Sequence, residues 1–320
     1  MKNVKQLFLI CLLSILGIKA FSMEKEITLT TKTGNLYGTL LTPDNNPQKE
    51  IVALFICGSG PTDRDGNSQP LGMVNNSIKY LAEDLCNTGI PSLRYDKRGI
   101  AKSAEAMVSE DILRFDTYSD DARDWIKLLA KDYKQVIIIG HSEGAMLGIM
   151  ASIDNPKVVS LVLLSGCGRA ADLVLKEQLA NQGGAMLKMT TDMAFPIIDS
   201  LKQGKTVSDV PQAFYALFRP SVQPYLISWF AVDPVVEIRK VTVPILIIQG
   251  DKDIQISVED AELLHQASKN STQIVIPNMN HVFKGCETMD NEVQMPLYSN
   301  PALKNVPQLS ECVIEFINKI

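Results

Sequence analysis

The strongest chemical signal in the sequence is a serine flanked by two glycines, in the segment GHSEG at residues 140–144. Four β-forming residues precede this segment, and a run with small residues at helical spacing follows it. A sharp turn from strand to helix would expose the Ser142 Oγ, and glycines two residues away on either side give such a turn room. The pattern therefore predicts that Ser142 is a nucleophile.

A serine hydroxyl near neutral pH needs a base before it can act as a nucleophile, and the chain contains three histidines. His141 adjoins the serine, so the turn should direct its ring elsewhere. His265 lies in a helical pattern that is typical of a surface or packing position. His281 lies in the loop after the last expected strand, where open α/β sheets collect their reactive groups. We therefore predict that His281 is the base.

A catalytic histidine is normally oriented by a carboxylate, and the segment GDKD at residues 250–253 offers Asp251 and Asp253. Asp251 follows the turn glycine so closely that its side chain should still point along the strand. Asp253 stands three residues beyond the glycine and can curl back toward the histidine loop. We predict that Asp253 orients His281 and that Asp251 caps the turn.

Attack on a carbonyl produces an oxyanion, which needs two hydrogen-bond donors. One predicted donor is the backbone N–H of Glu143, directly after the nucleophile. The other is the backbone N–H of Ser59 in the segment CGSGP at residues 57–61, whose glycines let the backbone approach a substrate. The alternatives are a plain glycine-rich strand end and a phosphate-binding loop, and the latter would require a following Lys-Ser or Lys-Thr pair.

The elements that must position these residues alternate between short apolar runs and helical patterns, which is typical of a parallel sheet covered on both faces. An antiparallel hairpin is expected first, over residues 26–32 and 35–42. The expected parallel strands are 51–57, 90–95, 136–140, 158–165, 243–249 and 273–276. The expected helices are 78–88, 117–131, 143–153 and 258–269. The sequence therefore predicts an α/β fold with a mostly parallel, eight-stranded sheet flanked by helices.

Residues 166–233 interrupt this alternation, because they contain helical patterns but no clear strand. We predict that they form a helical cap on a core made of residues 23–165 and 234–320. Phe214, Phe218 and Trp229 belong to this segment and are candidates to line a substrate pocket. The alternative is that the cap aromatics simply pack the cap helices on the core.

The first 22 residues have the features of a secretory signal peptide. Lys2 and Lys5 precede an apolar run over residues 7–18, and Ala20-Phe21-Ser22 provides a small-x-small cleavage site. An uncleaved anchor is the alternative, but the run is shorter than the roughly 20 residues that span a bilayer. We therefore expect export to the periplasm or the medium after cleavage near Ser22, with no stable membrane insertion of the mature chain.

Composition excludes several other classes of protein. The chain carries 31 Lys and Arg against 36 Asp and Glu, for a net charge of −5, and it has no basic block, so nucleic-acid binding is not expected. Without Cys11 five cysteines remain, and we expect them to be mostly small buried residues, although a Cys286–Cys312 bridge is conceivable. No cysteine and histidine cluster has zinc spacing, so we expect neither metal nor cofactor.

Two further segments join these motifs, GSGPTDRDGN at residues 58–67 and RYDKRG at residues 94–99. Together the motifs resemble the α/β-hydrolase superfamily, and more narrowly the bacterial carboxylesterases of the serine-aminopeptidase-like group. The resemblance covers residues 26–320 and implies a Ser142, Asp253 and His281 triad with Ser59 and Glu143 as oxyanion donors. Cys57 and Ala101 depart from it, since relatives often carry histidine and glycine there, and the cap resembles relatives least.

The expected function is a serine hydrolase that cleaves small-molecule carboxylic esters of short to medium acyl chain through an acyl-enzyme. The sequence specifies no oligomeric state. A serine aminopeptidase is the alternative, and it would need a cap acid to hold the substrate α-ammonium, for which the candidates are Asp172, Glu177, Asp192, Asp199 and Asp209. A non-catalytic binding protein on this fold is less expected, because it would normally have lost part of the triad, which here is complete.

Overall fold

The computed structural model describes residues 22–44, 50–181 and 184–320, and in them eight strands form one sheet. The strand order is β1-β2-β4-β3-β5-β6-β7-β8. β1 (Ser22–Thr31) and β2 (Gly34–Pro43) form the expected antiparallel hairpin, and β2 pairs antiparallel with β4 (Ser92–Tyr95). The other pairings are parallel. They run from β4 to its neighbour β3 (Ile51–Ile56) and then, each strand pairing with the next, through β5 (Gln135–His141), β6 (Val158–Leu164), β7 (Ile245–Gly250) and β8 (Ser271–Ile276). The predicted mostly parallel, eight-stranded sheet is therefore confirmed.

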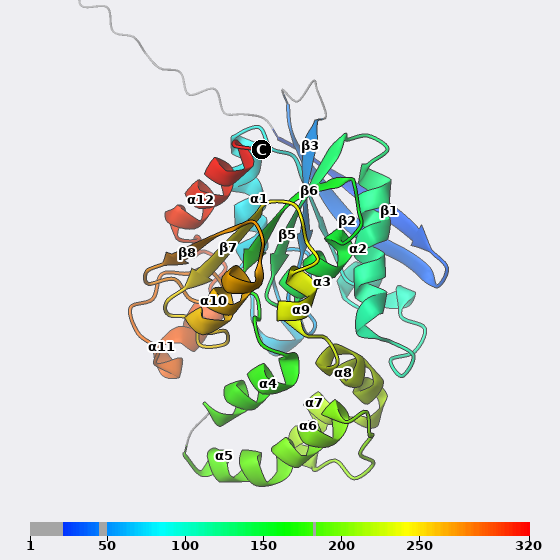
Figure 1. Cartoon of the computed structure of the whole chain (residues 1–320), viewed down its shortest axis with the longest axis vertical. Helices are drawn as coiled ribbons and strands as arrows, with labels where there is room; N and C mark the ends of the chain where they lie inside the picture. The colour runs from blue at the N-terminus through cyan, green and yellow to red at the C-terminus, as the bar shows by residue number, and fades with distance from the viewer. Residues whose placement is uncertain (1–21, 45–49, 182–183) are drawn as a thin grey trace, which may run out of the picture.

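Helices cover both faces of this sheet because successive strand residues point to opposite sides. In β5, Ile137 and Ile139 pack toward α1 and α12, whereas Val136 and Ile138 pack toward the other helix layer. Figure 1 shows the two layers on opposite sides of the sheet. The helices outside the cap are α1 (Ser77–Asn87), α2 (Phe115–Leu129), α3 (Glu143–Ser152), α9 (Pro234–Ile238), α10 (Val258–Ala267), α11 (Asn291–Gln294) and α12 (Pro307–Ile317).

Three of these helices, α9, α11 and α12, were not among the expected elements. The longest of them, α12, begins with Pro307 at its first position, where a missing N–H has no partner to lose. It then buries Leu309, Val313 and Ile317 against the sheet. The repeated four-residue spacing of these side chains is a helical signal, so α12 could have been predicted.

The cap helices lie beyond the carboxyl ends of the parallel strands, below the sheet in Figure 1. They are α4 (Ala171–Ala180), α5 (Gly184–Met189), α6 (Phe195–Lys202), α7 (Tyr215–Phe218) and α8 (Gln223–Phe230). The cap is fastened to the core at α2, where the ring of Phe115 stacks on Trp229 with centroids 5.6 Å apart. The Ser228 Oγ accepts a hydrogen bond from the Phe115 N–H at 2.8 Å.

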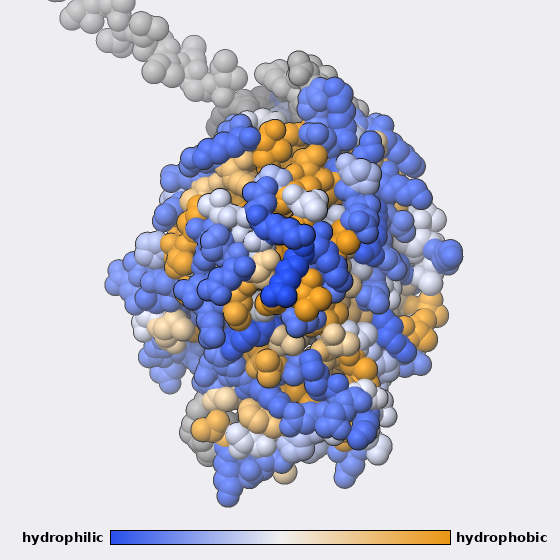
Figure 2. Space-filling model, viewed as in Figure 1, coloured by the Kyte–Doolittle hydropathy of each residue, from blue (hydrophilic) through white to orange (hydrophobic). Residues whose placement is uncertain are grey.

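The predicted signal peptide lies outside the described residues, apart from Ser22, which begins β1. Within the described ranges no helix combines the length and apolar character needed to cross a bilayer. The five cysteines described there are all unpaired, so the conceivable Cys286–Cys312 bridge is not formed. The face of the molecule in Figure 2 is largely hydrophilic, with hydrophobic residues in scattered patches, as on ordinary globular surfaces.

Truncation of the largest core side chain should reveal how much α2 contributes to stability. Trp125 is fully buried, and its ring lies 5.4 Å from that of Tyr95 at the end of β4. We expect Trp125→Ala to lower the free energy of unfolding by about 3–5 kcal/mol, because it removes apolar contacts and leaves a cavity. Urea unfolding measures the change, with exposed Lys127→Ala on the same helix as the control. Equal midpoints for the two variants would contradict this account of the core.

Candidate active site

Ser142 lies in a strained turn between β5 and α3, with φ 55° and ψ −122°. Non-glycine residues rarely adopt such a backbone, and here the close approach of the chain around the turn enforces it. A Cβ at Gly140 would lie 2.3 Å from the Gly144 carbonyl oxygen, and a Cβ at Gly144 would lie 2.1 Å from that of Ile56 in β3. The glycines of the GHSEG segment therefore allow α3 to start against the sheet, with Ser142 at the tip.

His281 and Asp253, which come from loops after β8 and β7, meet in a buried pair. The His281 Nδ1 lies 2.8 Å from the Asp253 Oδ2, and both residues are about 5 % exposed or less. Asp251 does not reach the histidine. Its Oδ1 accepts the Asn278 N–H at 2.6 Å, which holds the turn between the two loops. The structure thus brings Asp253 to His281 and gives Asp251 a turn contact.

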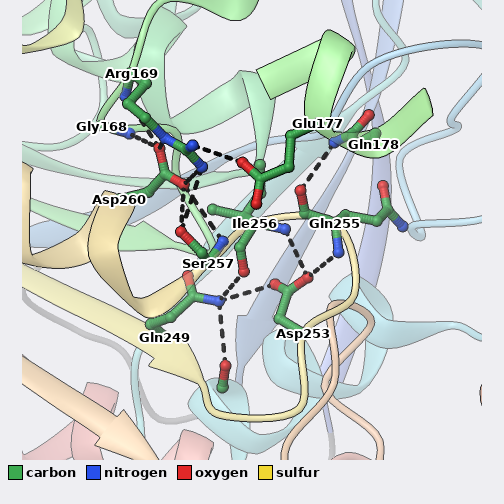
Figure 3. Close-up of polar contacts among 11 residues, drawn as sticks. Gly168, Arg169, Glu177, Gln178, Gln249, Asp253, Gln255, Ile256, Ser257 and Asp260 are labelled. Atoms are coloured by element: carbon green, nitrogen blue, oxygen red, sulfur yellow. Dashed lines mark hydrogen bonds and ion pairs between the residues drawn. The ribbon is translucent and has the colours of Figure 1, made fainter. Parts of the chain in front are cut away.

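The Asp253 carboxylate is held by three further donors, which Figure 3 displays. The backbone N–H groups of Gln255 and Ile256 donate to its Oδ1 at 2.8 and 3.0 Å, and the Gln249 amide donates to its Oδ2 at 3.0 Å. Burial raises the pKa of this carboxyl, but the charge and hydrogen bond of His281 outweigh burial and hold the pKa below its ordinary value. Asp253 is therefore an anion fixed in one orientation toward the histidine ring.

The loop that carries Asp253 is also tied to the cap. The Gln178 amide on α4 donates to the Gln255 carbonyl oxygen at 3.0 Å (Figure 3). Arg169, just before α4, pairs with Asp260 on α10 and with Glu177 on α4. These contacts fix the start of the cap, at α4, relative to α10 and the loop that carries Asp253.

His141 has its own structural contact, away from the serine. Its Nε2 lies 2.9 Å from the His281 carbonyl oxygen, and its ring packs against His281 and Phe283 with centroids 4.7 and 4.8 Å apart. Burial, and then the neighbouring His281, lower the pKa of His141 to about 3. A carbonyl can only accept, so neutral His141 donates its Nε2–H and buttresses the backbone of the His281 loop.

Ser142 and His281 both line one cavity of about 840 Å³. Ser59 and the adjoining Gly58 and Gly60 also line it, and a Cβ at Gly58 would lie 3.2 Å from the Ser142 Cβ. Among the described residues no hydrogen bond occupies the backbone N–H of Ser59 or Glu143. The two predicted oxyanion donors therefore flank the nucleophile with their N–H groups free.

The three cap aromatics expected at the substrate pocket do not line this cavity, which corrects that expectation. Phe214 and Phe218 are at most 4 % exposed and belong to the hydrophobic core of the cap. Trp229 stacks on Phe115 instead. His265, predicted as a surface or packing residue, contacts the Ser271 Oγ at 2.8 Å on the exposed side of α10.

The cavity has an apolar rim that sequence patterns did not reveal. Its apolar side chains include Leu71, Met73, Met289 and Met295. They come from loops and short 3-10 helices before α1 and after β8, where no periodicity signals a shared surface. Among the described residues no group of three or more His, Cys, Asp and Glu side chains could hold a metal ion.

Acid should destabilise the protein partly through His141. The unfolded chain binds a proton at this histidine below about pH 6.5, whereas the folded chain resists it until about pH 3. The folded-state pKa is depressed, so the free energy of unfolding falls as pH drops through this window. Between pH 6 and 4 we expect wild type to lose about 2 kcal/mol more than His141→Gln. Urea titrations measure this, with His265→Gln as control, and parallel curves for wild type and His141→Gln would contradict it.

Comparison with known proteins gives a family match and several related structures. The model of the serine aminopeptidase family S33 matches residues 72–213. Esterase EstD of Thermotoga maritima is 27% identical over 279 residues, which cover 85% of this chain and 62% of EstD. The matched part of this chain thus corresponds to less than two thirds of that relative.

Two solved structures show the shared fold. Est1E of Butyrivibrio proteoclasticus, solved with ferulic acid bound, superposes with a TM-score of 0.60 at 17% identity and covers 92% of this chain and 98% of its own. A proline iminopeptidase of Mycobacterium smegmatis gives a TM-score of 0.60 at 16% identity with the same coverage. Together with the sheet order and the turn at Ser142, these similarities show that the chain has the α/β-hydrolase fold.

Proposed function

We propose that this protein is a serine hydrolase that cleaves carboxylic esters through an acyl-enzyme intermediate. The observation that carries the proposal is that Ser142 shares a cavity with His281, whose Nδ1 is already bonded to buried Asp253 at 2.8 Å. The bond to Asp253 selects the tautomer in which the His281 Nε2 can accept a proton. This arrangement supports a nucleophile, a base and an orienting acid in those three roles.

In the proposed mechanism His281 accepts the proton of the Ser142 hydroxyl as its oxygen attacks the ester carbonyl. The negative charge that develops on the carbonyl oxygen is met by the N–H groups of Ser59 and Glu143. His281 then donates its proton to the leaving alcohol, which gives the acyl-enzyme. A water molecule, deprotonated by His281, attacks this acyl group and releases the acid together with free Ser142.

The lining of the cavity favours neutral esters over peptides with a free amino terminus. None of its described lining residues is Asp, Glu, Lys or Arg. The five cap acids that an aminopeptidase could use do not line it, and three of them are paired with cations: Asp172 with Lys202, Glu177 with Arg169, and Asp199 with Lys176. An α-ammonium placed there would lose water without gaining a counter-charge, which is unfavourable.

The size and chemistry of the cavity support a short to medium acyl chain. Apolar side chains on the rim, which include Leu71, Met73, Met289 and Met295, offer a surface for such a chain in place of the cap aromatics. Side-chain amides such as those of Asn181 and Asn291 line the cavity beside them and suit a neutral polar alcohol. The name of the relative Esterase EstD agrees with this choice of substrate class.

One prediction of this mechanism concerns the nucleophile. A fluorophosphonate probe should label wild type at one site, and Ser142→Ala should prevent labelling and lower kcat for a p-nitrophenyl ester by at least about 10⁴-fold. Intact-mass spectrometry and initial rates measure these effects, with Ser200→Ala on cap helix α6 as the control. Labelling that persists in Ser142→Ala would move the nucleophile elsewhere.

Another prediction of this mechanism concerns the substrate class. Because the cavity lining is uncharged, kcat/KM should be at least about 100-fold higher for p-nitrophenyl acetate or butyrate than for aminoacyl p-nitroanilides. N-acetylation of the anilides should not lower their already poor turnover, since no carboxylate awaits the free amine. A preference for free aminoacyl anilides that N-acetylation abolishes would favour the aminopeptidase instead.

A further inference from the structure

A buried lysine joins the two backbone segments that carry the oxyanion donors. Lys97 follows β4 and is only 2 % exposed. Its Nζ donates to the Gly58 carbonyl oxygen at 2.6 Å and to the Glu143 Oε1 at 2.7 Å. Gly58 precedes the donor Ser59, and Glu143 is the other donor residue. This single ammonium group therefore contacts both segments that carry a predicted oxyanion donor.

The contact with Gly58 determines where the Ser59 N–H points. The Gly58 C=O and the Ser59 N–H belong to one peptide group, which is planar and normally trans, so the two bonds point in opposite directions. Lys97 holds the carbonyl on one side, and the N–H must then project from the other. The segment runs close to the nucleophile, since a Cβ at Gly58 would lie 3.2 Å from the Ser142 Cβ.

The contact with Glu143 is made through its side chain and links the start of α3 to the same ammonium group. The Glu143 side chain is 2 % exposed, and its other oxygen accepts a hydrogen bond from the Tyr225 hydroxyl of cap helix α8 at 2.6 Å. The ring of Tyr118 lies 5.0 Å from the Lys97 Nζ and supplies a further favourable contact for the cation. Both carboxylate oxygens and the ammonium are thus partnered.

The residues beside Lys97 anchor the same turn. Asp96 accepts hydrogen bonds from the backbone and guanidinium of Arg64 at 2.8 and 2.7 Å, which ties the turn to the segment beyond Ser59. Arg98 pairs with Asp121 on α2. The RYDKRG segment at residues 94–99 is therefore anchored on both sides of Lys97, which fixes the position of the Lys97 ammonium group.

Resting on the proposed function, we propose that Lys97 is a positioning residue that aims the Ser59 N–H and holds it in register with the Glu143 N–H, so that the two form one oxyanion hole. Burying an ion pair is seldom a gain in stability over apolar packing, whereas it can enforce one geometry. The role expected for Lys97 is therefore in transition-state binding, without contact with the substrate.

The test compares Lys97→Met/Glu143→Gln with Glu143→Gln alone and with wild type. The double variant leaves no unpaired buried charge, so it should fold, while it removes the donor to Gly58. We expect its kcat for p-nitrophenyl butyrate to fall about 10- to 100-fold, less than the 10²–10³-fold typical of deleting an oxyanion donor, with KM changed less than about twofold. Inhibition by a trifluoromethyl ketone, whose adduct carries the oxyanion, should weaken by a similar factor. The single variant Glu143→Gln retains Lys97, so its kcat and its inhibitor affinity should fall less than those of the double variant.

The control is Lys102→Met, which removes a lysine five residues further along the chain whose partner is exposed Glu26, and it should keep wild-type kinetics. Wild-type kcat and inhibitor affinity in the folded double variant would overturn the role of Lys97 and leave the proposed function intact. A loss confined to KM would overturn it equally, because a merely structural or substrate-binding change acts there. A wild-type protein without esterase activity would overturn both proposals.

Discussion

The backbone of Ser142 stands at φ 55° and ψ −122° because α3 begins directly against β3 and β5, and the other groups of the site are arranged around that turn. A backbone in such a sparsely populated region costs about 1–3 kcal/mol and persists only where its surroundings enforce it. Here the hydrogen bond from the Ser142 N–H to the Leu164 carbonyl and the close approach at Gly144 provide that enforcement. Since the tip of the turn is fixed, the histidine loop and the loop of Ser59 can be matched to it.

The buried charged side chains near the Ser142 turn are paired with one another, and none of them lines the cavity. The pairs Arg64–Asp96, Lys97–Glu143 and Arg98–Asp121 all involve the turn after β4. An uncompensated charge in these surroundings would be strongly unfavourable, so each pair holds two segments in a defined position. The cap takes part through Tyr225 and Gln178, which contact Glu143 and the Asp253 loop. Cap and site therefore form one connected structure whose cavity lining is neutral.

Local signals made the sheet, the serine turn and the acid loop predictable from the sequence. Apolar runs and glycine spacing act over a few residues, and the chain order placed His281 near Asp253. The contacts of His141 and Lys97 could not be predicted, because their partners stand 140 residues away in one case and 39 and 46 in the other. The cap aromatics were misassigned because an aromatic side chain signals burial without saying against what. Gln249, a lone amide in an apolar strand, was a usable signal for a buried polar contact.

The central claim is that ester cleavage passes through a covalent acyl group on Ser142. The most direct measurement uses a p-nitrophenyl carbamate, whose carbamoyl-enzyme is hydrolysed slowly, followed by intact-mass and peptide mass spectrometry. The account predicts one carbamoyl group per chain, located on the peptide that contains Ser142, with release of one equivalent of p-nitrophenol. Stoichiometric p-nitrophenol release with no adduct, or an adduct on another residue, would contradict it.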